Sequence, residues 1–124
     1  MILSEQQSQI RDMARDFAQE CLFPGAGARD VSHDFPKDEL RQMGELGFLG
    51  MLVPEDYGGS DTGTVAYAVA LEEIAAGDGS CSTIMSVHNS VGCGPILKFG
   101  TEAQKQVILP KVAEGALTLA FAHS

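Results

Sequence analysis

The longest uncharged run of the chain spans residues 79–97 and predicts a helix that is enclosed by protein on most sides. Its large apolar residues recur at helical spacing: Ile84, Val87, Val91 and Ile96. Small polar residues, a histidine and an asparagine lie between them, which argues against a membrane-spanning helix. We expect residues 80–99 to form the central and most buried helix, loosened in its second half by two glycines and Pro95.

Amphipathic spacing predicts two helices before this run. The first begins with a capping-box pattern at Ser4 and Gln7 and is expected to end near Pro24. The small-residue segment 25–35 leaves both a short helix and an irregular connection open. A second helix is expected to open at residues 34–36, with three apolar residues on its buried side: Leu40, Met43 and Leu46.

Residues 46–63 predict an ordered loop, because glycines and a proline interrupt the helical period. Four apolar residues are expected to hold it in place: Phe48, Leu49, Met51 and Leu52. An alanine-rich third helix follows over residues 65–76, capped by Thr62 or Thr64, and residues 77–79 predict a turn into the central helix.

The end of the chain predicts one more helix and then a strand. Thr101 and Gln104 form a second capping-box pattern, and Pro110 is expected to disturb the helix that follows. Residues 117–122, LTLAFA, have the composition of a strand but no partner strand within the chain. We therefore expect an all-α, bundle-like domain over residues 1–116, followed by residues 117–124 as the first strand of a truncated β domain.

The net charge narrows the classes of expected partner, and the cysteine content indicates the compartment. The formal net charge is −9 and the pI is about 4.5, so neither nucleic acid nor an anionic membrane surface is an expected partner. Three cysteines without a CxxC pair predict reduced thiols in a cytosol-like compartment. Helical signals from Ser4 onward leave no room for a targeting peptide, and we expect a cytoplasmic protein without membrane insertion.

Several candidate sites also have simpler structural interpretations. Three glycines precede the third helix and could cradle a phosphate: Gly58, Gly59 and Gly63. Asp61 lies among them and no lysine follows, so a structural loop is favoured. The acidic pairs at 55–56 and 72–73 are adjacent in sequence, so neither pair predicts cooperating carboxylates on one helix face.

The histidines and cysteines give no strong signal of a reactive site. His33, His88 and His123 are too far apart in sequence to show ligand spacing, so no metal site is expected. A satisfied polar cluster is favoured over a catalytic one at residues 88–90. Cys93 has no neighbouring histidine pattern that would activate its thiol, although it lies close to glycines.

Four blocks in order carry a resemblance to a known family: ELGFLGMLVPEDYGG, ALEEIAAGDGS, SVHNSVGCGPILKFGTEAQKQVILPKVAEG and LAFA. Together they resemble the N-terminal helical domain of the acyl-CoA dehydrogenases. The resemblance implies that a β domain and a C-terminal four-helix bundle follow, with FAD between them. It also implies an oxidoreductase of fatty acid metabolism, in which a glutamate removes the α-proton of an acyl thioester while the flavin accepts the β-hydride.

The resemblance assigns roles to six residues. Ser90, Val91 and Gly94 match positions that line the acyl pocket. Phe121, His123 and Ser124 match positions that contact the flavin, although His123 departs from the aliphatic residue that is commonest there. The catalytic base lies in the missing C-terminal part, so no catalytic residue is assigned, and this fragment is expected to be inactive and to carry no flavin.

The resemblance thus predicts a piece of an FAD-dependent acyl-CoA dehydrogenase that forms a 2,3-enoyl-CoA. The implied partners are an acyl-CoA, an electron-transfer partner such as a flavoprotein, and further copies of the chain in a tetramer or dimer. Two alternatives stay open: the helical domain of a related flavoprotein oxidase or monooxygenase, and a free-standing helical interaction module.

Overall fold

Helices make up all the regular structure of the computed structural model, which describes residues 1–124. The α-helices are α1 (Glu5–Phe17), α2 (Phe23–Ser32), α3 (Lys37–Glu45), α4 (Thr64–Gly77), α5 (Gly79–Val87), α6 (Cys93–Phe99) and α7 (Glu102–Ala113). The π-helical turns are η1 (Ala18–Leu22) and η3 (His88–Gly92), and η2 (Glu55–Tyr57) is a 3₁₀ turn. The expected all-α fold class is confirmed.

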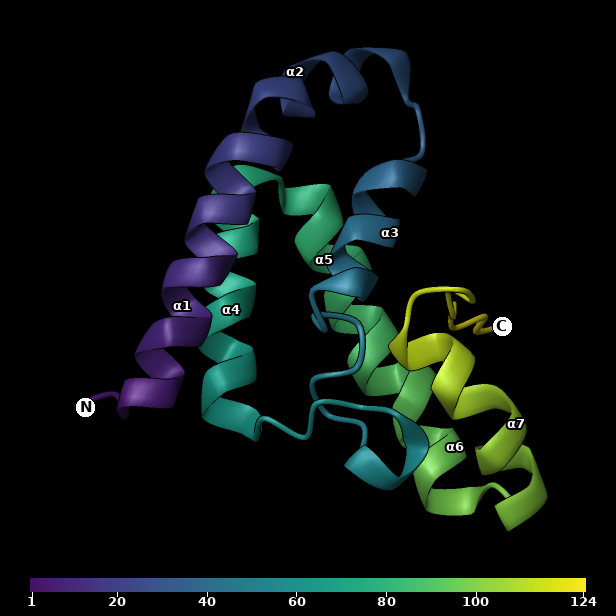
Figure 1. Ribbon diagram of the computed structural model, residues 1–124. Coiled ribbons are helices and arrows are strands. Elements are labelled where there is room, and N and C mark those ends of the chain that lie inside the picture. The colour runs from purple at the N-terminus through teal and green to yellow at the C-terminus, as the bar shows by residue number, and fades with distance from the viewer.

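Each π-helical turn connects two α-helices without an intervening loop. The helix α5–η3–α6 runs on as one long helix, whereas α2 turns across the end of α1 (Figure 1). The prediction that the first helix ends near Pro24 is confirmed, because α1 and η1 end at Leu22 and the chain then changes direction into the short helix α2 (Figure 1). Pro24 lies in the first turn of α2, directly after η1, where its missing N–H is tolerated. The second π-helical turn lies where the glycines of the central helix were expected to loosen it.

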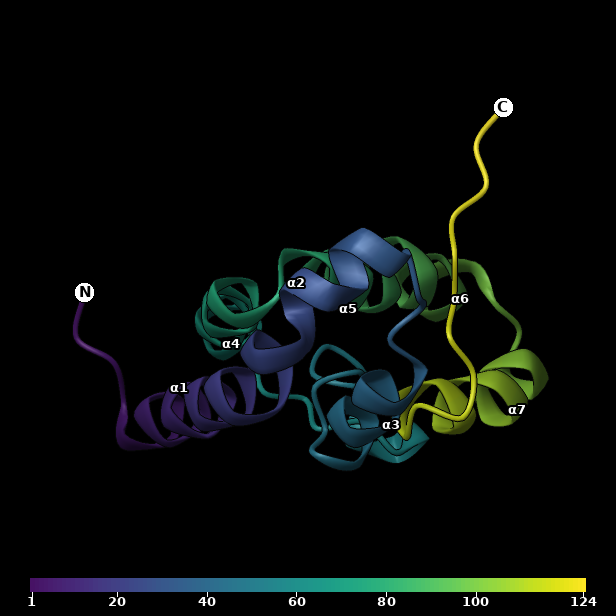
Figure 2. The same cartoon turned by 90° about the horizontal axis from the view of Figure 1, so that it is seen from above.

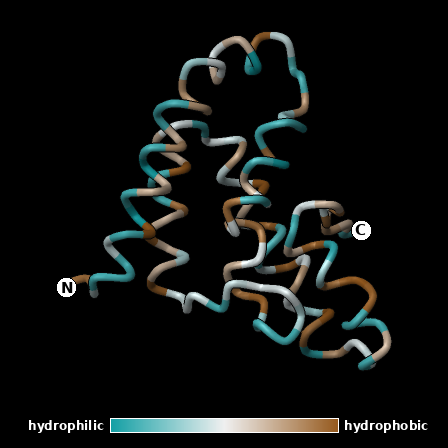
Figure 3. The backbone as a smooth tube through the Cα atoms, viewed as in Figure 1, coloured by the Kyte–Doolittle hydropathy of each residue, from teal (hydrophilic) through white to brown (hydrophobic).

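The helices form two layers, which Figure 2 shows from above. One layer contains α1, α3 and α7, and the other contains α4, α5 and α6, while α2 crosses one end (Figure 1). The larger core cluster lies between α1, α4, α5 and the segment after α3, and includes Phe17, Met43, Phe48, Ile74 and Met85. In Figure 3, α1 is largely hydrophilic with short hydrophobic interruptions, in agreement with a helix that buries one side only.

The central helix is less buried than its uncharged sequence predicts. Within residues 80–99 only five residues are buried: Cys81, Met85, His88, Asn89 and Cys93. Val87 is half-buried, Val91 is 42% exposed and Phe99 is 77% exposed. The expectation of a helix enclosed on most sides is therefore wrong for this chain, because one side packs on the core and the other is covered only in part, by the C-terminal segment around Leu119.

The loop between α3 and α4 is ordered as expected, and residues 48, 49 and 51 are buried in the core. Its backbone folds back on itself, with the amides of Ser60 and Thr62 donating to the carbonyls of Gly50 and Met51 at 2.9 Å each. Asn89 on the central helix adds a link that the sequence did not reveal, because its amide donates to the Phe48 carbonyl at 2.9 Å. A buried polar side chain thereby gains partners while it fixes the loop.

The helix caps were predicted with mixed success. Both capping boxes are present, at Ser4 with Gln7 and at Thr101 with Gln104. The expected threonine cap of α4 is wrong: Gly63, at a φ of 82°, occupies the capping position and makes no side-chain cap. Pro110 lies inside α7 without ending it.

The expected strand over residues 117–122 is not formed. This segment runs as irregular chain and projects away from the helices at the C-terminus (Figure 2). A strand requires a ladder of backbone hydrogen bonds to a neighbour, and none is available in this chain. The amide of Leu119 instead donates to the imidazole of His88 at 3.2 Å. The assignment of residues 117–124 to a β domain stays a prediction.

Candidate functional site

An apolar cavity of about 360 Å³ opens beside the central helix. Its lining residues come from α5, from the connection after α2 and from the C-terminal segment: Phe35, Thr83, Ile84, Val87, Thr118, Leu119 and Ala120. Residues 83, 84 and 87 share one helix face because they are three and four positions apart. The cavity has the size of a small-ligand site, and its lining suits an apolar chain rather than an ion.

The three predicted acyl-pocket residues lie beyond this cavity on the same continuous helix. Ser90 and Val91 are exposed, and the Ser90 hydroxyl donates to the Ser86 carbonyl at 2.6 Å. A Cβ built on Gly94 would meet no atom within 4 Å. The structure therefore leaves Ser90 and Val91 exposed and the half-buried Gly94 with open space beside it. It does not bring the three residues into the cavity, and their role stays a prediction.

The C-terminal segment is held across the central helix at one point. His88 is fully buried, its Nε2 lies 3.0 Å from the Val112 carbonyl oxygen, and its Nδ1 accepts from the Leu119 amide. Leu119 packs on Gly92, where an added Cβ would lie 2.8 Å from the Leu119 Cβ. Burial lowers the pKa of His88, and the bond to Val112 opposes this only in part. The expected satisfied polar cluster is confirmed for His88 and Asn89.

The predicted flavin contacts lie on the free end of this segment. Phe121 is exposed, and its ring stacks on that of His123 with centroids 6.2 Å apart. The backbone of residues 120–124 makes no hydrogen bond within the chain. Free amides and exposed rings fit a planar heterocycle that accepts hydrogen bonds and stacks, so these residues are compatible with a flavin edge. Their assignment to the cofactor stays a prediction.

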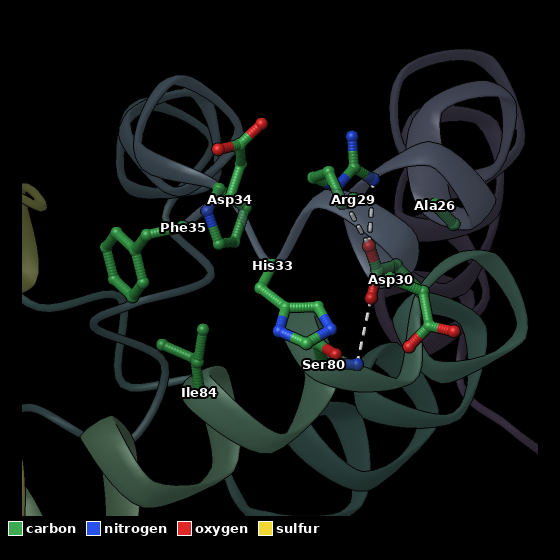
Figure 4. A pocket seen from close by; sticks show the side chains of 10 residues that line it. Ala26, Arg29, Asp30, His33, Asp34, Phe35, Ser80 and Ile84 are labelled. Atoms are coloured by element: carbon green, nitrogen blue, oxygen red, sulfur yellow. Dashed lines mark hydrogen bonds and ion pairs between the residues drawn. The ribbon is translucent and has the colours of Figure 1, made fainter.

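A second, polar cavity of about 360 Å³ lies between α2, the connection that follows it and the start of α5. Figure 4 shows Arg29, His33, Asp34 and Ser80 around the opening. Arg29 donates to Asp78 at 2.8 Å, to Glu39 at 3.0 Å and to the Leu22 carbonyl at 2.7 Å. Asp78 also caps α5, accepting from the amides of Ser80 and Cys81. Arg29 and Asp78 are thus paired within the cavity, whereas the other two acidic residues that line it, Asp30 and Asp34, form no ion pair.

The charges in this polar cavity stabilise each other's ionised forms. Burial alone would raise the pKa of Asp78, but hydrogen bonds from Arg29 and from two backbone amides outweigh it and lower the pKa. Burial opposes the charge on Arg29 as well, yet the hydrogen bond to Asp78 and the nearby Glu39 raise its pKa overall. The sequence showed Asp78 only as a turn residue and did not reveal this pair.

The other candidates of the sequence analysis are structural. Burial raises the pKa of Cys93 to about 11 and that of Cys81 to about 12, so neither thiol is a nucleophile at neutral pH. Gly59 packs directly on the Val53 carbonyl, and the glycines around it serve the loop backbone. No group of three or more His, Cys, Asp or Glu side chains is placed to hold a metal ion. No helix is both long and apolar enough to cross a membrane.

Comparison with known proteins gives a consistent result. Residues 4–116 match the family model described as acyl-CoA dehydrogenase, N-terminal domain. The mitochondrial short-chain specific acyl-CoA dehydrogenase of Bos taurus is 44% identical over 98% of this chain and 30% of its own length. The structure of butyryl-CoA dehydrogenase from Megasphaera elsdenii matches with a TM-score of 0.85 at 32% identity, over 94% of this chain and 31% of that chain.

A chain in the solved structure of the electron transferring flavoprotein of Acidaminococcus fermentans matches with a TM-score of 0.88 at 39% identity. That match covers 93% of this chain and 30% of the other. The chain spans 30% of the length of the Bos taurus relative.

Proposed function

The chain belongs to the acyl-CoA dehydrogenase family, through that family's N-terminal domain, and from this premise we propose that it is the helical part of an enzyme that oxidises a short acyl-CoA. The reaction is removal of an α-proton and a β-hydride to give the 2,3-enoyl-CoA. The names of the relatives, short-chain specific acyl-CoA dehydrogenase and butyryl-CoA dehydrogenase, support a short acyl chain. The observation that carries the proposal is the open, uncharged face of the central helix beside an apolar cavity.

In this proposal the chain's own residues bind and orient the acyl group. Val87 and Ile84 offer an apolar wall, and Val91 and Gly94 extend that wall along the helix. Gly94 leaves space for close approach because it has no side chain. An apolar chain packed here displaces water from the surface around the thioester. The base that takes the α-proton is expected outside residues 1–124.

FAD, when bound, supplies the acceptor for the β-hydride. Phe121, His123 and Ser124 would hold one edge of it through ring stacking, backbone amides and the Ser124 hydroxyl. These residues cannot enclose a flavin alone, so the rest of the binding surface is assigned to a β domain that residues 117–124 begin. The proposal also includes an electron-transfer flavoprotein as the redox partner. The enzyme is proposed to be a homo-oligomer and to be located in the cytoplasm.

The complete open reading frame from which the chain comes provides the test. The purified full-length protein is expected to be yellow, and anaerobic butyryl-CoA is expected to bleach its flavin absorbance. Product analysis should then find the 2,3-enoyl thioester. A protein that binds no flavin, or a flavin that no acyl-CoA reduces, would contradict the proposal.

Gly94→Phe tests the position of the acyl chain in that full-length enzyme. A phenyl ring on the open face should obstruct a longer chain more than a short one, so we expect kcat/KM for octanoyl-CoA to fall about tenfold more than for butyryl-CoA. Gly27→Phe is the matched control, because Gly27 is also helical with nothing within 4 Å of an added Cβ, but lies on α2. Equal losses for both substrates in Gly94→Phe would remove this residue from the acyl site.

A further inference from the structure

The two hydrogen bonds of His88 determine which ring nitrogen carries its proton. A carbonyl oxygen can only accept, so the nitrogen that faces the Val112 oxygen, Nε2, must carry a hydrogen. A backbone amide can only donate, so the nitrogen that faces the Leu119 amide, Nδ1, must be bare. Both bonds exist together only in the neutral Nε2–H tautomer.

These bonds join three parts of the chain. His88 is on η3, Val112 is in α7, and Leu119 is on the segment that leaves the helical domain. The bond to Leu119 is the last hydrogen bond between that segment and the helices, since the backbone of residues 120–124 makes none. Leu119 also fills the space over Gly92, so position 92 has no room for a side chain.

We propose that His88 is the positioning residue of the C-terminal segment: its neutral imidazole holds Leu119 on the central helix, and protonation at Nδ1 releases residues 119–124. We call the three linked residues His88, Val112 and Leu119 the His88 clamp. Protonation places a second N–H against the Leu119 amide, so that two donors face each other and the hydrogen bond is lost.

The surroundings of His88 favour its neutral ring, so that acid must overcome the cost of a buried imidazolium to break the clamp. Charged residues of α7 near Val112, namely Lys111 and Glu114, are exposed, and neither pairs with His88. On its own helix the nearest titratable group is the buried Cys93, whose raised pKa keeps the thiol neutral. The C-terminal segment adds only the exposed His123. No carboxylate therefore offsets the burial of an imidazolium, and burial favours the neutral ring.

The consequence for the cofactor rests on the proposed function. Phe121, His123 and Ser124 lie two to five positions beyond Leu119, so the His88 clamp sets the direction in which the proposed flavin contacts leave the domain. The clamp itself is a property of residues 88, 112 and 119 and requires no flavin.

Amide hydrogen exchange and ¹⁵N NMR on the 124-residue chain test the clamp. The ring nitrogens of His88 should show protonated Nε2 and bare Nδ1 at pH 7.5. The Leu119 amide should be protected about fivefold or more relative to Ala122. This protection should be lost only in acid below the ordinary titration range of histidine, because burial lowers the pKa of His88. Both the tautomer of His88 and the protection of the Leu119 amide can be measured on the unsubstituted chain.

Three variants separate the clamp from general instability. His88→Gln keeps one donor and one acceptor without titrating, and should retain Leu119 protection through the acid range. His88→Leu removes both bonds and should abolish protection at every pH. His33→Asn is the control, because His33 is exposed, lies at a φ of 63° that asparagine tolerates, and should leave the profile unchanged.

Two results would overturn the proposal. One is a wild-type Nδ1–H tautomer, or a Leu119 amide that exchanges as fast as Ala122 at pH 7.5. The other is His88→Gln losing protection in acid as the wild type does, with the core amide of Leu109 still protected. Neither result depends on acyl-CoA oxidation, so a failure of the clamp and a failure of the proposed function are distinguishable.

Discussion

Met85→Asp is expected to unfold the chain, whereas Val87→Asp, two positions further along the same helix, is expected to leave it folded. Met85 is fully buried in the main core cluster, so an aspartate there is an unpaired buried charge that costs about 4 kcal/mol or more. That is a large part of the roughly 5–15 kcal/mol that stabilises a domain. Val87 is half-buried at the edge of an open cavity, where water can reach a carboxylate, and the cost should be about 1 kcal/mol.

Chemical denaturation followed by circular dichroism measures both variants. Met85→Leu is the matched control, because it keeps the volume and the apolar character of the site and should cost less than about 1.5 kcal/mol. Equal destabilisation by the two aspartates would show that Val87 is as enclosed as Met85. It would restore the expectation, drawn from the uncharged run, that the whole central helix is core.

This pair of residues shows where the sequence stops being informative about burial. Apolar spacing correctly indicated a helix through residues 80–99, because the helical period is a local property. It did not distinguish Met85 from Phe99, since an apolar residue is equally suited to this chain's core and to a surface that another part of a longer protein covers. The exposed apolar residues of the central helix are therefore consistent with a chain that spans 30% of its relative's length.

Local hydrogen-bond patterns were predictable, whereas tertiary ones were not. The capping boxes at Ser4 and Thr101 involve residues three positions apart and follow from sequence alone. Asn89 reaches a carbonyl 41 positions away, and Arg29 reaches a carboxylate 49 positions away. Only one signal in the sequence could have indicated the contact of Asn89, namely an asparagine within a largely apolar run. The strand failed for a related reason, because residues 1–124 contain no other strand with which it could pair.

The candidate site shows the same difference between features that are local in sequence and features that depend on tertiary packing. The resemblance in sequence supplied the residues of the open helix face, since each lies in a recognisable block. The sequence did not supply the link between His88 and Leu119, which brings together residues 31 positions apart. Nor did it predict the cavity beneath that segment, because cavities depend on how helices pack.

Arg29→Met should be the second most damaging of the changes proposed here, because it leaves Asp78 buried without its partner. The Asp78 side chain is 7% exposed and that of Arg29 is 16% exposed, so we expect a loss of about 3 kcal/mol, the lower end for a broken buried ion pair. Methionine keeps much of the arginine stem's packing, so the loss reports on the charge. Asp78→Asn keeps the cap of α5 and removes the charge, and should cost less.

The double variant Arg29→Met/Asp78→Asn separates the ion pair from packing. If the damage comes from an uncompensated carboxylate, the double variant should be more stable than Arg29→Met alone, since neither charge is left buried. Lowering the pH gives an independent check. The lowered pKa of Asp78 means that the pair's contribution is complete above about pH 4 and is lost as the carboxylate is protonated below it. Wild type and Arg29→Met should therefore converge in stability in acid, and a constant difference between them down to pH 2 would assign the loss to packing instead.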